Sequence, residues 1–495
     1  MNNYLKVMLV FSFVLAFLTA CQKSPESGVV VSKNDGSFDV SVIQSATEAT
    51  KPTQNDTASE EVVLETEPSP SYYFEQDFSS SDGSVTFQMR LDVETRSSSM
   101  PVVEVSPHFL TEEDVQRVGK ALLGNADFYE AEPLMAPVYS KSELQEKITR
   151  WSAYDGEGIG FDDYNAARNR YIQEYTLLME TAPEENPHRS CSWTFKKGSE
   201  YVLPADELAT AKTDQDCDEI QACAKVNGIP YNFHAAKRNS SDYKLNQLYL
   251  DISDGSSPYN SDLRIFHAQL CRTPAPTEED LHMLKEKAAS LLKEMALGEW
   301  EIDQCTVETE YYGDTPEYVV TVTAVPSFKG IPACRRPQIN NLKSSTTYAS
   351  NYYLTDAQFQ FSVKGDLLGF EMYSPVDLKS VISPNVQTLN LEDLMQTAVN
   401  HFTLSDAHAY DVQQYLDGNV ELDCTVYIDH ADYGLSRVKV PNTDESYYYL
   451  PAIVFWGHAD YTEKDTGLVL DNYGEEHPFL ILNAIDGSII NATNE

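Results

Sequence analysis

The feature that most constrains the fold of this chain is a strict alternation of apolar and polar side chains over residues 357–364. The alternating residues are, in order, Ala357, Gln358, Phe359, Gln360, Phe361, Ser362, Val363 and Lys364. Successive side chains of a strand point to opposite faces of a sheet, so one face of this strand is buried and the other lies in water. The pattern is typical of an antiparallel sheet, because buried parallel strands carry continuous apolar runs instead.

Amphipathic helices precede the alternating segments. The residues Thr-Glu-Glu-Asp at 277–280 open an apolar stripe at helical spacing, and Gly298 marks its end. The same four residues stand at 111–114, and Asn390 opens a further stripe. Threonine or asparagine at such a position caps free backbone amides, and acids there favour the positive end of the helix. We therefore predict an α+β fold in which single helices pack on antiparallel sheets.

The order of these elements indicates duplication in the C-terminal half. A helix followed by alternating strands is expected at 276–378 and again at 379–495, which predicts two related helix-plus-sheet units. Coincidence is the alternative, because short capped helices and alternating strands are common. Residues 71–275 form a separate mixed α+β region in this interpretation, and the topology of 189–275 stays undefined.

The first twenty-one residues carry a targeting signal. An apolar run at 7–18 follows Lys6, and it is shorter than the ~20 residues that a membrane-spanning helix requires. The run ends in Leu-Thr-Ala-Cys at 18–21, which resembles a bacterial lipobox. The resemblance implies a signal peptide at 1–20, lipidation of Cys21, and an anchor in the cell membrane that faces outside the cytoplasm. An ordinary secretory signal and a short uncleaved anchor are the alternatives.

The segment that follows the signal is polar and acidic. Residues 21–70 cannot bury enough apolar surface to offset the entropy of ordering, so we predict a disordered tether. Over the whole chain, 35 Lys and Arg stand against 77 Asp and Glu, which gives a formal net charge of −42. A field of this sign repels phosphate backbones, so no nucleic-acid partner is expected.

Two segments near the C-terminus carry a family resemblance. Residues 449–456 (YLPAIVFW) and 478–491 (PFLILNAIDGSIIN) resemble the end of PepSY-type domains and the related C-terminal region of YycI/YycH-like regulators. Residues 370–375 (FEMYSP) and the helix at Leu391 resemble a group of uncharacterised Gram-positive lipoproteins with such a tail. These motifs consist of turn and strand residues. The resemblance implies a PepSY-like unit at 379–495 and an extracytoplasmic binding or regulatory role.

Partial matches to catalytic motifs favour structural roles. The tripeptide Asp-Thr-Gly at 465–467 matches aspartic proteases, but it occurs once and lies between strands. Ser290 and Lys293 match an S-x-x-K motif, yet both fall off the apolar stripe of their helix. Cys191 is not followed directly by tryptophan, as a cysteine-protease nucleophile would be. We therefore predict no catalytic residues.

Metal and cofactor sites are not predicted. The loop from Asp155 to Asp163 holds several carboxylates, but Ile159 occupies a position where a calcium loop needs an oxygen ligand. Whether calcium binds there stays open. The 10 histidines show no ligand spacing.

The cysteines other than Cys21 are odd in number, so at least one stays unpaired outside the cytoplasm. Cys305 and Cys334 lie within one predicted unit and are the preferred disulfide. Cys424 alternates with apolar positions of a strand, so it is expected to be a buried free thiol.

Tyrosines supply the candidate partner surface. The chain has 30 tyrosines and 4 tryptophans, and adjacent rings on a strand must point to opposite faces. Exposed tyrosine is favoured at binding surfaces, so Tyr447, Tyr448, Tyr449 and Trp456 are expected to hold an envelope protein or a glycan. The alternative is that these rings pack beneath a neighbouring helix or unit.

Together these features favour a membrane-anchored, non-enzymatic lipoprotein that binds or regulates an envelope component. An envelope hydrolase with paired carboxylates and a solute-binding lipoprotein are the alternatives. With 77 acidic residues, a suitable carboxylate pair arises by chance, so abundance alone does not favour an enzyme.

Overall fold

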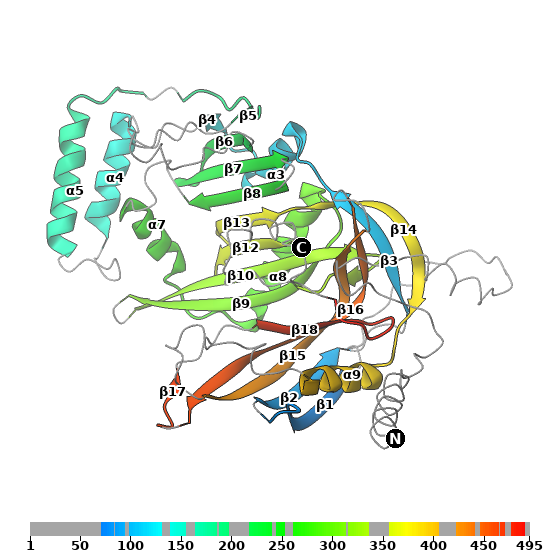
Figure 1. Cartoon of the computed structure of the whole chain (residues 1–495). Coiled ribbons are helices and arrows are strands. Elements are labelled where there is room, and N and C mark those ends of the chain that lie inside the picture. Colours follow the sequence, from blue (N-terminus) through cyan, green and yellow to red (C-terminus); the bar gives the residue numbers. More distant parts are fainter. Residues whose placement is uncertain are drawn as a thin grey trace, which may run out of the picture.

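The computed structural model describes residues 71–490 except 84, 95–98, 131–138, 155–163, 186–187, 198–216, 240–243, 253–260, 313–314, 336–355, 405–421, 441–445, 465 and 471–476. The described residues form six helices and two β-sheets that are mostly antiparallel (Figure 1). The predicted α+β class is therefore confirmed. None of the described helices is both long and apolar enough to cross a lipid bilayer.

The first sheet, called the large sheet below, has ten strands. Its main order is β11 (Ile331–Pro332), β10 (Thr315–Phe328), β12 (Ala357–Ser362), β13 (Leu367–Tyr373), β8 (Lys244–Ile252), β7 (Ile229–Asn239), β6 (Cys217–Val226) and β4 (Tyr129–Glu130). β9 (Trp300–Tyr312) pairs with β10, and β5 (Lys196–Lys197) pairs with β6. The alternating residues 357–362 form β12, and Phe359 and Phe361 lie fully buried in the core.

Two sets of elements in the same order build the large sheet. α3 (Glu112–Leu123) precedes β4, β6, β7 and β8, and α8 (Glu278–Met295) precedes β9, β10, β12 and β13. The last strands of the two sets, β8 and β13, pair antiparallel at the centre of the sheet. α3 and α8 contact each other and share one apolar core. The segments 112–252 and 278–373 therefore each place a helix before antiparallel strands of the same sheet.

Both of these helices begin at the predicted capping threonine, which forms a capping box. The side chain of Thr111 accepts from the amide of Asp114, whose carboxylate accepts from the amide of Thr111 at 2.9 Å. Thr277 and Asp280 repeat the arrangement at the start of α8, with a distance of 2.8 Å. These bonds satisfy backbone amides that the first helical turn leaves without partners.

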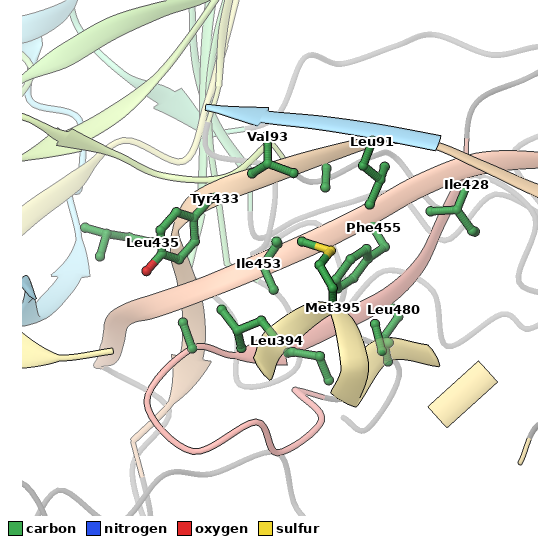
Figure 2. Packing of buried hydrophobic residues seen from close by; sticks show 14 of the residues in the cluster. Leu91, Val93, Leu394, Met395, Ile428, Tyr433, Leu435, Ile453, Phe455 and Leu480 are labelled. Carbon is green, nitrogen blue, oxygen red and sulfur yellow. The ribbon is translucent and has the colours of Figure 1, made fainter. Parts of the chain in front are cut away.

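The second sheet, called the small sheet below, has eight strands and joins both ends of the described chain. Its main order is β1 (Ser71–Ser79), β2 (Val85–Glu94), β15 (Leu422–Lys439), β16 (Tyr447–Glu463), β3 (Ser99–Pro107) and β14 (Val376–Gln387). β17 (Val469–Leu470) and β18 (His477–Asn483) also pair with β16. α9 (Leu391–Leu404) covers one face, and Figure 2 shows Leu394 and Met395 directed toward Ile453 and Phe455 of β16.

β16 is buried on both faces, which corrects the predicted partner surface. Tyr447, Tyr448, Tyr449 and Trp456 are 5%, 6%, 4% and 1% exposed. Tyr447 and Tyr449 belong to the core that contains α9, whereas Tyr448 and Trp456 pack in a second core on the other face. Adjacent rings do point to opposite faces, but β16 is a central strand and both of its faces are covered. These four residues form no partner surface.

The two sheets meet where the chain leaves β11. The amide of Cys334 donates to the carbonyl of Leu435 in β15 at 2.8 Å. Gly434 allows this approach, because a Cβ at that position would lie 2.6 Å from the carbonyl oxygen of Pro332. The core of the small sheet also includes Val325 of β10, so the apolar packing continues across the junction.

The sheets cut across the predicted regions. β1, β2 and β3 come from the predicted region 71–275, yet they belong to a sheet whose other strands begin at residue 376 or later. The remaining strands of that region complete the large sheet. α4 (Lys141–Ala153), α5 (Tyr164–Met179) and α7 (Ser261–Cys271) form a separate apolar cluster beside it (Figure 1). The predicted signal peptide and tether at 1–70 lie outside the described residues.

Candidate binding groove between the two sheets

A groove of about 690 Å³ lies at the junction of the two sheets. Residues of β2, β9, β11 and β15 line it, together with the segment 333–335. Arg335 is the only Lys or Arg among the lining residues. Six of the lining residues are carboxylates, namely Asp92, Glu94, Glu301, Asp303, Asp429 and Asp432. The groove is therefore strongly acidic, and its volume is in the range of ligand sites in proteins.

Strand bulges bring two of the carboxylates into the groove. In the ladder of β9 and β10, pairing passes from Gln304–Thr323 to Ile302–Ala324, so Asp303 is an extra residue. In the ladder of β15 and β16, pairing passes from Ile428 directly to His430, so Asp429 is an extra residue. A bulge redirects the side chains around it and is common next to functional sites.

Gly457 makes the bulge at Asp429 possible. It pairs with Ile428 just before the bulge. A Cβ at position 457 would lie 1.7 Å from the carbonyl oxygen of Tyr427, which no side chain can tolerate. Glycine at this position lets the two strands approach closely while β15 changes direction.

Two histidine–aspartate pairs lie at the bulge. Nε2 of His430 lies 2.7 Å from Oδ1 of Asp432, and Nδ1 of His458 lies 3.3 Å from Oδ2 of Asp429. The ring of His458 also stacks on Tyr427 with the centroids 4.7 Å apart. His430, Asp432 and Asp429 line the groove, whereas His458 supports Asp429 from the neighbouring strand.

Arg335 is held by residues of both sheets. Its guanidinium donates to the side-chain oxygen of Gln304 in β9 and lies 4.9 Å from the ring centroid of Trp456 in β16. The neighbouring thiol of Cys334 donates to the carbonyl of Asp432 at 3.5 Å. These contacts fix the 333–335 segment against the wall formed by β15.

Tyr433 is a lining residue whose side chain packs in the core of the small sheet. The side chain is 7% exposed, and its hydroxyl donates to Oγ1 of Thr388 at 2.8 Å. Burial raises the pKa of the Tyr433 hydroxyl, although the bond to Thr388 opposes this shift. The phenol therefore stays neutral and adds no charge to the groove.

The predicted disulfide does not form, because its two cysteines lie in different cores. Cys305 packs against the core of the large sheet, opposite Val322, whereas Cys334 packs against the second core of the small sheet. Both are free thiols. Cys424 is a buried free thiol as predicted, and burial raises its pKa to about 11.

The described residues of the other partial motifs lie in surroundings that do not favour catalysis. Ser290 lies on the exposed side of α8 and donates to Glu294 at 3.5 Å. Burial raises the pKa of Cys191, which disfavours a reactive thiolate. Cys21, Asp465 and the loop from Asp155 to Asp163 lie outside the described residues. Within the described ranges, no group of three or more His, Cys, Asp or Glu side chains is arranged to hold a metal ion.

A Cys–His–Glu arrangement lies away from the groove. Sγ of Cys271 is 3.8 Å from Nε2 of His267, whose Nδ1 is 3.6 Å from Oε2 of Glu317. Nε of Arg272 also lies 3.3 Å from Oε1 of Glu317. Cys271 is fully buried, so no substrate reaches its sulfur. The cluster connects α7 to β10.

Sequence reasoning missed the groove, although one signal was readable. Buried positions in β15 fall on Cys424, Val426 and Ile428, and then on Ala431 and Tyr433. The change from even to odd numbers shows an inserted residue in the alternation. That change indicates a bulge near Asp429 even when the strand that pairs with this segment is unknown. The contributions of β2 and β9 depend on long-range pairing and leave no such local trace.

No known family model matches this chain. No protein of curated function matches it either. Among solved structures, it is similar to an uncharacterised protein from Eubacterium rectale ATCC 33656, with a TM-score of 0.33 and 10% identity over 82% of this chain and 90% of that one. It is also similar to the C-terminal domain of Bacillus megaterium YpeB, with a TM-score of 0.23 and 11% identity over 57% of this chain and 98% of that one.

Proposed function

We propose that this protein is a lipid-anchored, extracytoplasmic binding module without catalytic activity, and that its groove holds a positively charged segment of an envelope partner. The observation that carries the proposal is the convergence of six carboxylates on one groove. Two of them, Asp303 and Asp429, are extra residues of strand bulges. A groove with this charge attracts cationic groups and disfavours anionic ones.

The anchor in this proposal is supported by the sequence alone. The apolar run at 7–18 ends in Leu-Thr-Ala-Cys, and acyl chains on Cys21 would hold the protein at the membrane. A chain of net charge −42 is repelled by anionic lipid. Residues 21–70 would separate the folded part from the anchor, which leaves the groove accessible to a partner in the envelope.

Binding of an acetylated, amidated hexalysine to the full chain tests the groove. The variant that combines Asp303→Asn and Asp429→Asn removes two groove charges, and we expect about tenfold weaker binding by calorimetry. The matched control combines Glu279→Gln and Glu392→Gln, which are exposed on α8 and α9 and change the net charge equally. The control should bind as tightly as wild type.

Attraction of the peptide by the net charge of the whole protein would give a different result. If both double variants weaken binding to the same degree, the peptide is attracted by the whole surface and the groove is not the site. Circular dichroism of each variant checks that its fold is retained.

A further inference from the structure

The large sheet has a polar face opposite the face that α3 and α8 cover. In the four neighbouring strands β7, β8, β13 and β12 (Figure 1), alternate residues belong to the core shared with these helices, among them Phe233, Leu250, Phe370 and Phe359. The residues between them point to the opposite face, because side chains alternate along a strand. Those on the opposite face are half-buried and include His234, Tyr249, Asp251, Gln358, Glu371 and Tyr373.

Three carboxylates form a diagonal row across this polar face. Glu371 of β13 pairs with Tyr249 of β8, so Asp251, two residues further along β8, is a diagonal neighbour of Glu371. Glu371 also pairs with Gln358 of β12, so Asp356, two residues earlier, is its diagonal neighbour on the other side. Diagonal neighbours on one face of a sheet lie about 7–8 Å apart. Asp251, Glu371 and Asp356 are called the carboxylate row below.

Two oxygen atoms of the carboxylate row lack a hydrogen-bond donor. Oδ1 of Asp251 and Oδ1 of Asp356 are buried and accept no hydrogen bond within the part of the chain that the structure describes. The other oxygen of Asp356 accepts from Nε2 of Gln358 at 3.1 Å. Buried polar atoms without partners are rare in folded proteins and cost free energy. These two atoms therefore indicate a ligand that donates hydrogen bonds.

The electrostatic surroundings favour a positively charged ligand. Burial raises the pKa of Asp251 to about 6 and also raises the pKa of Asp356. His234 opposes the shift at Asp251, and Arg335 opposes the shift at Asp356, but burial outweighs both. Nε2 of His234 also lies 3.4 Å from the carboxylate of Glu219. A bound cation would stabilise the ionised form of these carboxylates.

Two tyrosines adjoin the carboxylate row. Tyr249 lies opposite Glu371, and the hydroxyl of Tyr373 donates to Oε2 of Glu371 at 3.2 Å. Burial raises the pKa of the Tyr249 hydroxyl to about 12, so the phenol stays neutral. Neutral aromatic rings attract organic ammonium groups through their faces and also contact methylene groups.

We propose that the carboxylate row binds a linear diamine or polyamine, whose ammonium groups donate to Asp251 and Asp356 and whose methylene chain lies along the two tyrosines. An ammonium group carries several N–H donors and a positive charge, which are the two properties that the row requires. The row lies outside the groove, since none of its residues lines that cavity. The proposal is therefore independent of the proposed function.

The first test compares two dications on the full, unaltered chain. 1,6-Diaminohexane and hexamethonium carry the same charge on the same six-carbon chain, but only the diamine has N–H donors. We expect the diamine to bind about tenfold more tightly by calorimetry, because it alone can donate to the buried oxygen atoms. Equal binding of the two dications, or no binding of the diamine, overturns the proposal and leaves these oxygen atoms to water alone.

The second test locates the binding of the diamine. The variant that combines Asp251→Asn and Glu371→Gln should bind 1,6-diaminohexane about tenfold more weakly than wild type. The double variant of the groove and the exposed double variant of α8 and α9 remove the same charge elsewhere, and both should bind the diamine as wild type does. Circular dichroism checks that each variant is folded.

Each contrary result of the second test has a distinct meaning. Equal weakening in all three double variants means that net charge alone attracts the diamine, and weakening only in the groove variant places the diamine in the groove. Either result overturns the proposal. If the row variant binds hexalysine more weakly but the diamine as well as wild type does, the row takes lysine side chains of a protein and the proposal of a free amine fails.

Discussion

Asp114 and Asp280 occupy the same position in two identical capping sequences, but their surroundings differ. Nε2 of His108 lies 3.1 Å from the Asp114 carboxylate, and Arg117 also donates to it. Burial raises the pKa of Asp114, but bonds from Thr111, His108 and Arg117 outweigh burial and lower the pKa to about 2. Asp280 lies at the surface, and the bonds from its capping threonine lower its pKa.

Asp114→Asn should lower the free energy of unfolding by about 2 kcal/mol at pH 7. The folded pKa of Asp114, about 2, lies below the unfolded value of ~3.9, so the carboxylate stabilises the fold above about pH 4. That contribution disappears as the pH falls toward 2. Urea unfolding at pH 7 and pH 3 should therefore show a smaller difference between wild type and variant at the lower pH.

Asp280→Asn is the matched control for this prediction. It replaces the same carboxylate of a capping box, but one without the contacts of His108 and Arg117, so its effect should be smaller. An equal loss of stability in the two variants would mean that the contacts of His108 and Arg117 add nothing to the contribution of the capping box. His108 also lies 2.9 Å from Asp377 at the start of β14, so it links α3 to the small sheet.

At the scale of elements, local sequence patterns determine faces and ends. The alternation in β12 places Phe361 in the core and leaves Gln360 exposed, as the period of two requires. Both Thr-Glu-Glu-Asp sequences form capping boxes. Faces and ends are readable because they depend on residues close together in the chain.

Phe361→Asp should unfold the large sheet, whereas Gln360→Asp should change its melting temperature little. Phe361 is fully buried beside Phe359, with stacked rings 5.9 Å apart. An unpaired carboxylate there costs several kcal/mol, which is comparable with the ~5–15 kcal/mol stability of a domain. Thermal unfolding followed by circular dichroism checks both variants, and similar melting temperatures would contradict the assignment of the buried face.

At the scale of the whole molecule, the sequence does not reveal which strands share a sheet. β3 pairs with β14 and β16, although a large part of the chain separates them. The predicted region 71–275 therefore divides between two sheets. The groove could not be predicted for the same reason, because its lining comes from three separate parts of the chain, at 92–94, 301–335 and 429–434. The prediction that the rings of β16 are exposed was wrong for a related reason. Whether a strand is central or at an edge depends on the assembled sheet, and the local sequence does not show it.

Cys21→Ser should move the protein out of the membrane fraction or leave an unprocessed precursor. Stable anchoring needs acyl chains, and serine offers no thiol for them. Detergent-phase partitioning and the mass of the mature chain measure the change. Cys191→Ser is the control, because this cysteine lies in the folded part and its replacement leaves the anchor in place. Equal partitioning of the two variants into detergent would end the lipoprotein hypothesis.

The parallel pairing of β2 with β15 has a consequence for the order in which the protein is made. Val85 pairs with Cys424, so β2 is synthesised long before its parallel partner β15 exists. The strands of the large sheet all lie within 129–373. This sheet can therefore form while the apolar face of β2 is still exposed. The small sheet closes only when β15 and β16 have been synthesised. A truncation that removes these strands would therefore leave β2 without β15 and β3 without β16.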